Sequence, residues 1–168
     1  MLCFVAASMM FVTTSCDKEN DNDIEGINIQ VPTDGMVIVE DNIVEVTVEA
    51  ARDLSKGNCS WLLATSGTQK SLIYPACAAK MNYHFLKPSD EQQDIIQSSI
   101  RDVKSGNLKI AGEKIHNVVT ELWRERDVPV TMGCTELPIA YAASGLPDEK
   151  QVSSLKALSD ACIKTLYA

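Results

Sequence analysis

Short apolar runs alternate with longer amphipathic segments over residues 27–168, and this alternation limits the possible folds more than any other feature of the chain. The run Cys59–Ala64 and the segment Val128–Met132 have the length and apolar content of buried strands. Ile95–Val103 and Ile110–Leu122 instead carry apolar residues at helical spacing. Because alternating strands and helices favour parallel strand pairs, we expect an α/β fold with a parallel sheet covered by helices on both faces.

The remaining elements are predicted from the same periodicities. Ile27–Val31 predicts a short strand, and Val37–Leu54 fits both periods, although its length favours a helix. Ser71–Met81 predicts a helix with Pro75 in its first turn or at a kink. Tyr83–Leu86 predicts a short strand. Ser89 with Gln92 forms a capping-box pattern at the start of the next helix, which Gly106 ends. The last helix is expected to begin near Asp148 and to bury Val152, Leu155, Leu158, Cys162 and Leu166.

Charge and cysteine spacing argue against two classes of function. The net charge is −8, so binding to nucleic acid through phosphate neutralisation is not expected. The six cysteines include no Cys-x-x-Cys pair, which argues against a zinc site. Cys59, Cys77 and Cys162 lie in apolar patterns, where we expect inert core thiols.

The amino-terminal segment has the pattern of an export signal. An apolar run, Leu2–Val12, is too short to span a membrane, and it ends at Thr13–Cys16 before an abrupt acidic stretch. This pattern resembles a bacterial lipoprotein signal, which implies lipidation at Cys16 and anchoring in the bacterial cell envelope, in the periplasm or at the outer membrane. The alternative is a frayed apolar end on a cytoplasmic protein. We therefore expect a signal segment over residues 1–16, an acidic linker over 17–26 and an α/β domain over 27–168.

The peptide Met132–Pro138 carries a thiol, a hydroxyl and a carboxylate in succession directly after a predicted strand. Ligands of α/β folds gather at the carboxyl ends of strands. Backbone N–H groups at the start of the next helix would favour the thiolate of Cys134, which is the reactive form. The alternative is that Cys134 is a small apolar residue of the core.

Two further segments have side chains suited to an anionic substrate. Thr65, Ser66, Gly67 and Thr68 follow the strand Cys59–Ala64, and their hydroxyls and backbone N–H groups could cradle an anion. The alternative for this segment is an ordinary helix N-cap turn. Lys104 lies near the end of a predicted helix, where its default role is to interact with the helix C-terminus.

In order and in spacing, several peptides resemble the carboxyl-terminal half of the aspartate/glutamate racemase family. Lys104 and Cys134 lie 30 residues apart, a separation expected of aspartate racemases. The matching stretches are Leu62–Thr68, Ile73–Tyr74, Glu91–Gln92, Val103–Asn107 and Gly133–Pro138.

The resemblance implies a cofactor-independent racemase of an acidic amino acid. In that family two similar halves enclose the active site, and each half contributes one cysteine that moves a proton at Cα. Cys134 would be the cysteine of the carboxyl half. Thr135 and the Thr65–Thr68 loop would hold the α-carboxylate and the amino group, and Lys104 would pair with a side-chain carboxylate. Glu136 stands where glutamate racemases tend to carry histidine, which favours aspartate.

The first cysteine motif of the family, Cys-Asn-Thr, is absent from this sequence, since neither Cys3 nor Cys16 is followed by Asn-Thr. Three hypotheses follow: a racemase whose activity is in doubt, an envelope-tethered module that binds a dicarboxylate or amino acid without catalysis, and a decarboxylase-type lyase that needs one cysteine. We also expect part of the last helix to expose apolar surface, which favours a homodimer.

Overall fold

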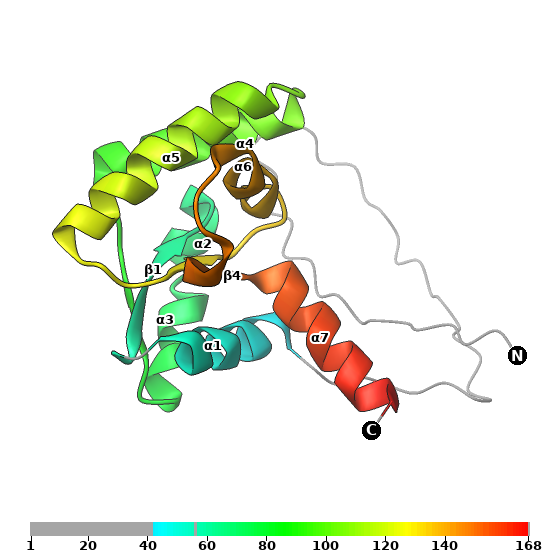
Figure 1. Ribbon diagram of the computed structural model, residues 1–168. Helices are drawn as coiled ribbons and strands as arrows, with labels where there is room; N and C mark the ends of the chain where they lie inside the picture. Colours follow the sequence, from blue (N-terminus) through cyan, green and yellow to red (C-terminus); the bar gives the residue numbers. More distant parts are fainter. Residues whose placement is uncertain (1–41, 56, 168) are drawn as a thin grey trace, which may run out of the picture. The chain divides into compact units, whose positions relative to one another are not determined.

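The computed structural model describes residues 42–55 and 57–167, which contain a four-stranded parallel sheet of order β2-β1-β3-β4 (Figure 1). The strands are β1 (Cys59–Leu63), β2 (His84–Leu86), β3 (Val130–Met132) and β4 (Gln151–Ser153). The helices are α1 (Ile43–Leu54), α2 (Ser66–Ser71), α3 (Ile73–Lys80), α4 (Asp90–Lys104), α5 (Leu108–Glu125), α6 (Leu137–Ser144) and α7 (Ser154–Tyr167), with a 3₁₀ turn, η1 (Asp148–Lys150). The expected parallel α/β architecture is confirmed.

One face of the sheet is covered by α4, α5 and α6, and we call this side the aliphatic layer. Trp61 and Leu63 of β1 meet it together with Val130 and Met132 of β3. Helices α4 and α5 contribute fully buried aliphatic side chains because their apolar residues recur at helical spacing. The largest of these are Ile96, Ile100, Ile115, Val118, Val119 and Leu122.

The opposite face is covered by α1 and α3, with α7 packed against α1, and we call this side the hydroxyl-rich layer. Leu62 and Ala64 point into it because side chains alternate along a strand. Buried hydroxyl groups stand among its apolar residues. The Ser60 and Thr131 hydroxyls bond each other at 2.8 Å across β1 and β3, and the Ser55 hydroxyl donates to the Cys59 carbonyl at 2.6 Å.

Several local sequence signals act as expected. Ser89 and Gln92 form a reciprocal capping box at the start of α4, and Gly106 follows that helix with φ 78°. The ambiguous segment Val37–Leu54 contains helix α1, whose N-cap Asn42 accepts a hydrogen bond from the Val44 N–H. Pro75 lies in the first turn of α3, where its missing N–H costs no helical hydrogen bond.

The prediction for the last helix was wrong at its start. Asp148–Lys150 is a 3₁₀ turn and Gln151–Ser153 is strand β4, so α7 begins only at Ser154. A three-residue edge strand with one apolar residue has too little alternation to be recognised. Val152 is therefore buried in the sheet, and Leu155, expected in the core, is 44% exposed.

Three further expectations need correction. Ile95 and Ile110 were assigned to buried helix faces, but they are 39% and 48% exposed, because each lies beside the buried stripe of its helix. The expected helix Ser71–Met81 is interrupted at Leu72, which has φ 55° and separates α2 from α3.

Some expectations fall outside the described residues: the strand Ile27–Val31, the signal segment with Cys16 and the acidic linker. In the part of the chain that the structure describes, none of the helices is both long and apolar enough to cross a membrane.

The order of the strands creates a topological switch point at one end of the sheet. After β1 the chain passes through α2 to α3 in the hydroxyl-rich layer, whereas after the neighbouring strand β3 it enters α6 in the aliphatic layer. The loops that follow β1 and β3 therefore diverge to opposite faces. In open α/β sheets such a switch point is where ligands bind.

Candidate functional site

Cys134 lies at this switch point, two residues beyond β3 and three before α6. Its side chain is partly buried against the aliphatic layer. Burial raises the pKa of the thiol from 9.0 to about 12, although the backbone N–H groups of Glu136 and Leu137 act in the opposite direction. The backbone N–H groups lower the pKa of the thiol, as expected. Burial raises the pKa by more, so the thiolate is not favoured overall. At neutral pH Cys134 is a thiol.

The residue before Cys134 is tightly packed. A Cβ atom added to Gly133 would stand 3.0 Å from Cε2 of Tyr74 and 3.4 Å from Cβ of Ala64. Tyr74 is 4% exposed, and its hydroxyl contacts Thr47 of α1 and Ser154 of α7. The ring of Tyr74 therefore supports the loop that carries Cys134, a role that no sequence motif announced.

The Thr65–Thr68 segment forms the start of helix α2 rather than an open loop. Thr65 is the N-cap, and its hydroxyl accepts the Thr68 N–H at 3.1 Å and bonds the Thr68 hydroxyl at 2.9 Å. The Ser66 N–H donates to Oε1 of Gln97 at 2.9 Å. Two of the N–H groups expected to cradle an anion thus already have protein partners, which agrees with the N-cap alternative.

Two glutamines of α4 were missed by the sequence analysis. Gln93 and Gln97 lie one helical turn apart, a spacing that places both on one face of the helix. Gln93 is 7% exposed, and its Nε2 donates to the Ala64 carbonyl at the end of β1 at 3.0 Å. With Gln97 bonded to Ser66, both side chains fix the loop after β1.

Lys104 reaches the same end of the sheet from the end of α4. Its Nζ lies 3.6 Å from Oε1 of Glu136, and the other carboxylate oxygen of Glu136 accepts the Thr135 hydroxyl at 3.1 Å. The structure therefore brings Lys104, Thr135 and Glu136 together beside Cys134. Lys104 supplies the positive charge of this cluster. Its side chain is exposed, so the ammonium can reach a ligand.

The other described cysteines lie away from the switch point. Cys59 is buried at the amino end of β1, as expected of a core thiol. Cys77 and Cys162 are only partly buried, so the expectation of core thiols was too strong for them. Burial raises the pKa of Cys77, and Glu45 of α1 acts in the same direction.

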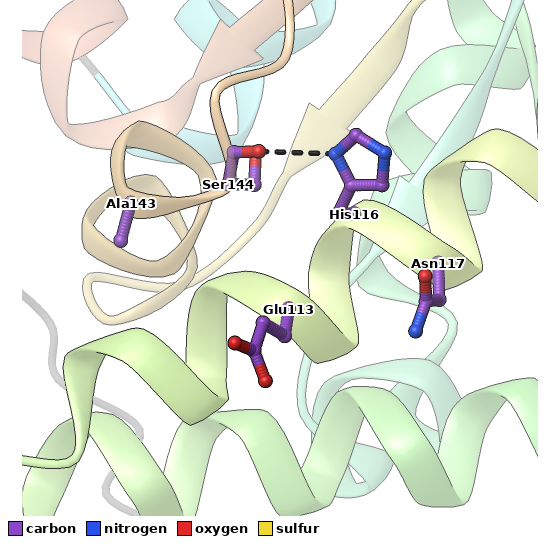
Figure 2. A pocket seen from close by; sticks show the side chains of 5 residues that line it. All are labelled: Glu113, His116, Asn117, Ala143 and Ser144. Carbon is purple, nitrogen blue, oxygen red and sulfur yellow. Dashed lines mark hydrogen bonds between the residues drawn. The ribbon is translucent and has the colours of Figure 1, made fainter.

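The two hollows described for the surface lie elsewhere. One, of about 350 Å³, lies between α5 and α6, where Nδ1 of His116 is 3.0 Å from the Ser144 carbonyl oxygen (Figure 2). The other, of about 200 Å³, lies between α1, β4 and α7. Neither is lined by Cys134, Thr65 or Lys104. The candidate site therefore lies outside both of these hollows.

The cluster around Cys134 offers no metal site. Within residues 42–55 and 57–167, no group of three or more His, Cys, Asp or Glu side chains is arranged to hold a metal ion.

Similarity to known proteins is found in the sequence and in the fold. No family model matches the sequence. An uncharacterized protein from the pnlA 3′ region of Pectobacterium carotovorum subsp. carotovorum is 31% identical over 98 residues, which cover 58% of this chain and 65% of that protein. It has no described activity to compare.

Two solved structures share the fold. The aspartate racemase of Picrophilus torridus is 28% identical, with a TM-score of 0.61, over 77% of this chain and 55% of that structure. An aspartate racemase homologue from Pyrococcus horikoshii OT3 is 22% identical, with a TM-score of 0.56, over 76% of this chain and 56% of that structure, and it supports the fold alone. The chain thus spans about half the length of the solved structures it matches, and its fold is similar to that of an aspartate racemase.

Proposed function

We propose that this chain moves a proton at Cα of an acidic amino acid, with aspartate as the best fit. One observation carries this proposal: a thiol, an ammonium and a set of hydroxyl groups meet at the switch point of a racemase-like sheet. The class of reaction is an isomerase type by similarity to the Picrophilus torridus aspartate racemase.

The substrate would be held by its two carboxylates. Lys104 would pair with the side-chain carboxylate, since its side chain is 64% exposed and reaches the cluster. Thr135 and the segment Thr65, Ser66, Gly67 and Thr68 would hold the α-carboxylate and the amino group. They would do so through hydroxyl groups, because the N–H groups of Ser66 and Thr68 already have protein partners. Glu136 would take part in substrate binding by positioning Lys104 and Thr135, since its two carboxylate oxygens contact the ammonium and the hydroxyl.

Cys134 would act first as an acid. With its pKa raised to about 12, the group is a thiol at neutral pH, so it donates a proton more readily than it accepts one. For racemisation, the cysteine thiolate of a second half, as the family resemblance implies, would remove the α-proton from the opposite side of Cα and become a thiol. The carbanion would then take the proton of the Cys134 S–H group, which leaves a thiolate on Cys134. Reversal of these steps gives the other enantiomer, as general acid–base catalysis by two positioned groups requires.

An exchange experiment tests this proposal. The full chain is incubated separately with L-aspartate and D-aspartate in deuterated water, and deuterium at Cα and optical rotation are followed. We expect exchange that the Cys134→Ala variant loses by about 10²–10⁴-fold, the usual contribution of a positioned acid or base. Cys162→Ala is the matched control, because Cys162 is also a half-buried thiol but lies on α7.

Lys104 provides the second variant. The uncharged Lys104→Met should raise KM for aspartate about 10–100-fold and leave kcat nearly unchanged, since a bond to a charged group is worth about 1.5–3 kcal/mol. Saturable binding without exchange would support the non-catalytic binding module instead. No binding of aspartate at all would overturn both proposals.

The protonated state of Cys134 also supports the single-cysteine lyase as a second candidate. A decarboxylase of that kind needs only a thiol that protonates the carbanion left when carbon dioxide departs, which a thiol with a raised pKa suits. Release of carbon dioxide from a malonate-type acid, lost in Cys134→Ala, would select this candidate. Failure to release it while aspartate exchanges would reject it.

A further inference from the structure

The ion pair at the candidate site has one partner that a ligand could replace. Lys104 Nζ lies 3.6 Å from Glu136 Oε1, which is longer than a direct charged hydrogen bond. The ammonium side chain is 64% exposed and the carboxylate side chain 23% exposed. Exposed pairs of this kind are weak, so an incoming carboxylate could exchange with Glu136 at little cost.

Glu136 is held in place by more than Lys104. Its second carboxylate oxygen, Oε2, accepts the Thr135 hydroxyl at 3.1 Å, and its backbone is the N-cap of α6. If Lys104 turned to a ligand, Glu136 would keep its position through these contacts. Its negative charge would then act on its surroundings without a neighbouring cation.

The thiol of Cys134 is one group on which that charge acts. Burial is the main cause of its raised pKa, and the Glu136 carboxylate adds to it through its charge and as a hydrogen-bond acceptor. The other titratable group facing the thiol is Tyr74 of α3, a neutral phenol whose pKa is raised by burial. Lys104 of α4 is the ion-pair partner of Glu136.

We propose that Glu136 is an internal competitor for Lys104: the distal carboxylate of an acidic ligand takes its place on the ammonium, and the released Glu136 carboxylate then keeps Cys134 in the proton-donating form. The proposal rests on the proposed function for the identity of the ligand. It makes Glu136 a positioning residue rather than a group that reacts with the substrate. It also makes the site selective for acids with a second carboxylate, since only these replace Glu136.

The first test measures ligand binding. Dissociation constants of L-aspartate and L-asparagine are compared for the wild-type chain and Glu136→Gln; the two ligands have the same shape, and only aspartate has the distal charge. Removing the competitor should lower the dissociation constant of L-aspartate by up to about fivefold, which corresponds to the free energy of an exposed ion pair. The dissociation constant of L-asparagine should not change. Asp160→Asn is the matched control, because it removes a carboxylate from the exposed Lys156–Asp160 pair on α7.

The second test needs no ligand. Alkylation of Cys134 by iodoacetamide is followed by mass spectrometry of its peptide between pH 7 and pH 10. Glu136→Gln should react about three- to tenfold faster than the wild type at pH 8, since a fall of one pKa unit gives tenfold more thiolate. Asp160→Asn should react as the wild type does.

The two tests separate this proposal from the proposed function. If Glu136→Gln weakens the binding of both ligands alike, Glu136 contacts the α-carboxylate or amino group that they share. The competitor role is then wrong. If alkylation is unchanged in Glu136→Gln, the carboxylate does not control the thiol and the proposal fails even where aspartate exchanges. If Glu136→Gln is alkylated faster but the chain binds no aspartate, the effect of Glu136 on the thiol is supported and aspartate is rejected as the ligand.

Discussion

The two layers that cover the sheet differ in how they exclude water. The aliphatic layer packs α4, α5 and α6 through branched side chains without exposed surface, such as Ile115 and Leu122. The hydroxyl-rich layer buries hydroxyl groups that are bonded to one another or to the backbone, such as Ser60 and Thr131. Both layers therefore gain stability from apolar burial, which is non-directional, and the second adds buried hydrogen bonds with fixed geometry.

This difference matters at the switch point because the candidate site draws on both layers. Cys134 packs against the aliphatic layer, which accounts for the burial that raises the pKa of its thiol. Tyr74, below the same loop, belongs to the hydroxyl-rich layer. The aliphatic layer thus keeps the sulfur protonated, and the hydroxyl-rich layer positions the loop that carries it.

The largest effect should come from opening a cavity in the aliphatic layer. Ile115→Ala removes a side chain with no exposed surface and should lower the free energy of unfolding by about 2–5 kcal/mol. Ile110→Ala, on the same helix but 48% exposed, should change it by less than about 0.5 kcal/mol. Urea denaturation measures both. Similar losses in the two variants would mean that α5 does not bury the face described here.

In the hydroxyl-rich layer, the free energy of unfolding should depend on whether buried hydroxyl groups keep their hydrogen-bond partners rather than on side-chain volume. Ser60→Ala leaves the buried Thr131 hydroxyl without its partner and should cost about 1–3 kcal/mol. Adding Thr131→Val should recover part of that loss, since removing both partners can be nearly neutral. A double variant as unstable as the sum of the single ones would show that the pair is not coupled.

The smallest effect is the alkaline loss of stability caused by Cys134. Below the unfolded pKa of about 9 the thiol is protonated in both states, and above it the unfolded state loses the proton while the folded state keeps it up to about pH 12. The unfolded state therefore binds fewer protons, and the free energy of unfolding falls as the pH rises.

The difference between the wild type and Cys134→Ser isolates this contribution, because the buried tyrosines titrate alike in both chains. Relative to the variant, the wild type should lose about 1.4 kcal/mol between pH 8 and pH 10, measured by urea denaturation at each pH. Parallel pH curves for the two chains would mean that the thiol ionises normally in the folded state.

The sequence predicted elements whose periodicity is long and failed where it is short. Helices α4 and α5 could be predicted because Ile96, Ile100, Ile115 and Leu122 repeat at helical spacing over many residues. Strand β4 has three residues, and only its pairing with β3 distinguishes it from the first turn of a helix. That pairing is a long-range contact that local patterns do not contain.

The candidate site shows the same division. Cys134, Lys104 and Glu136 were named from their peptides, and the structure brings them to one edge of the sheet. The protonation of the thiol was not predictable, because burial is set by α4, α5 and α6 together. Tyr74 and Gln93 were missed as supports because they act through Gly133 and the Ala64 carbonyl, contacts that no spacing rule specifies.

The close approach of Tyr74 to Gly133 has a consequence for redesign. The phenol hydroxyl touches α1 and α7 while the ring touches the peptide before Cys134, so one side chain joins three distant stretches of the chain. A graft that transfers only the short peptide around the cysteine to another scaffold would leave this brace behind. Any transplant of the reactive centre must carry the tyrosine and the glycine as a matched pair.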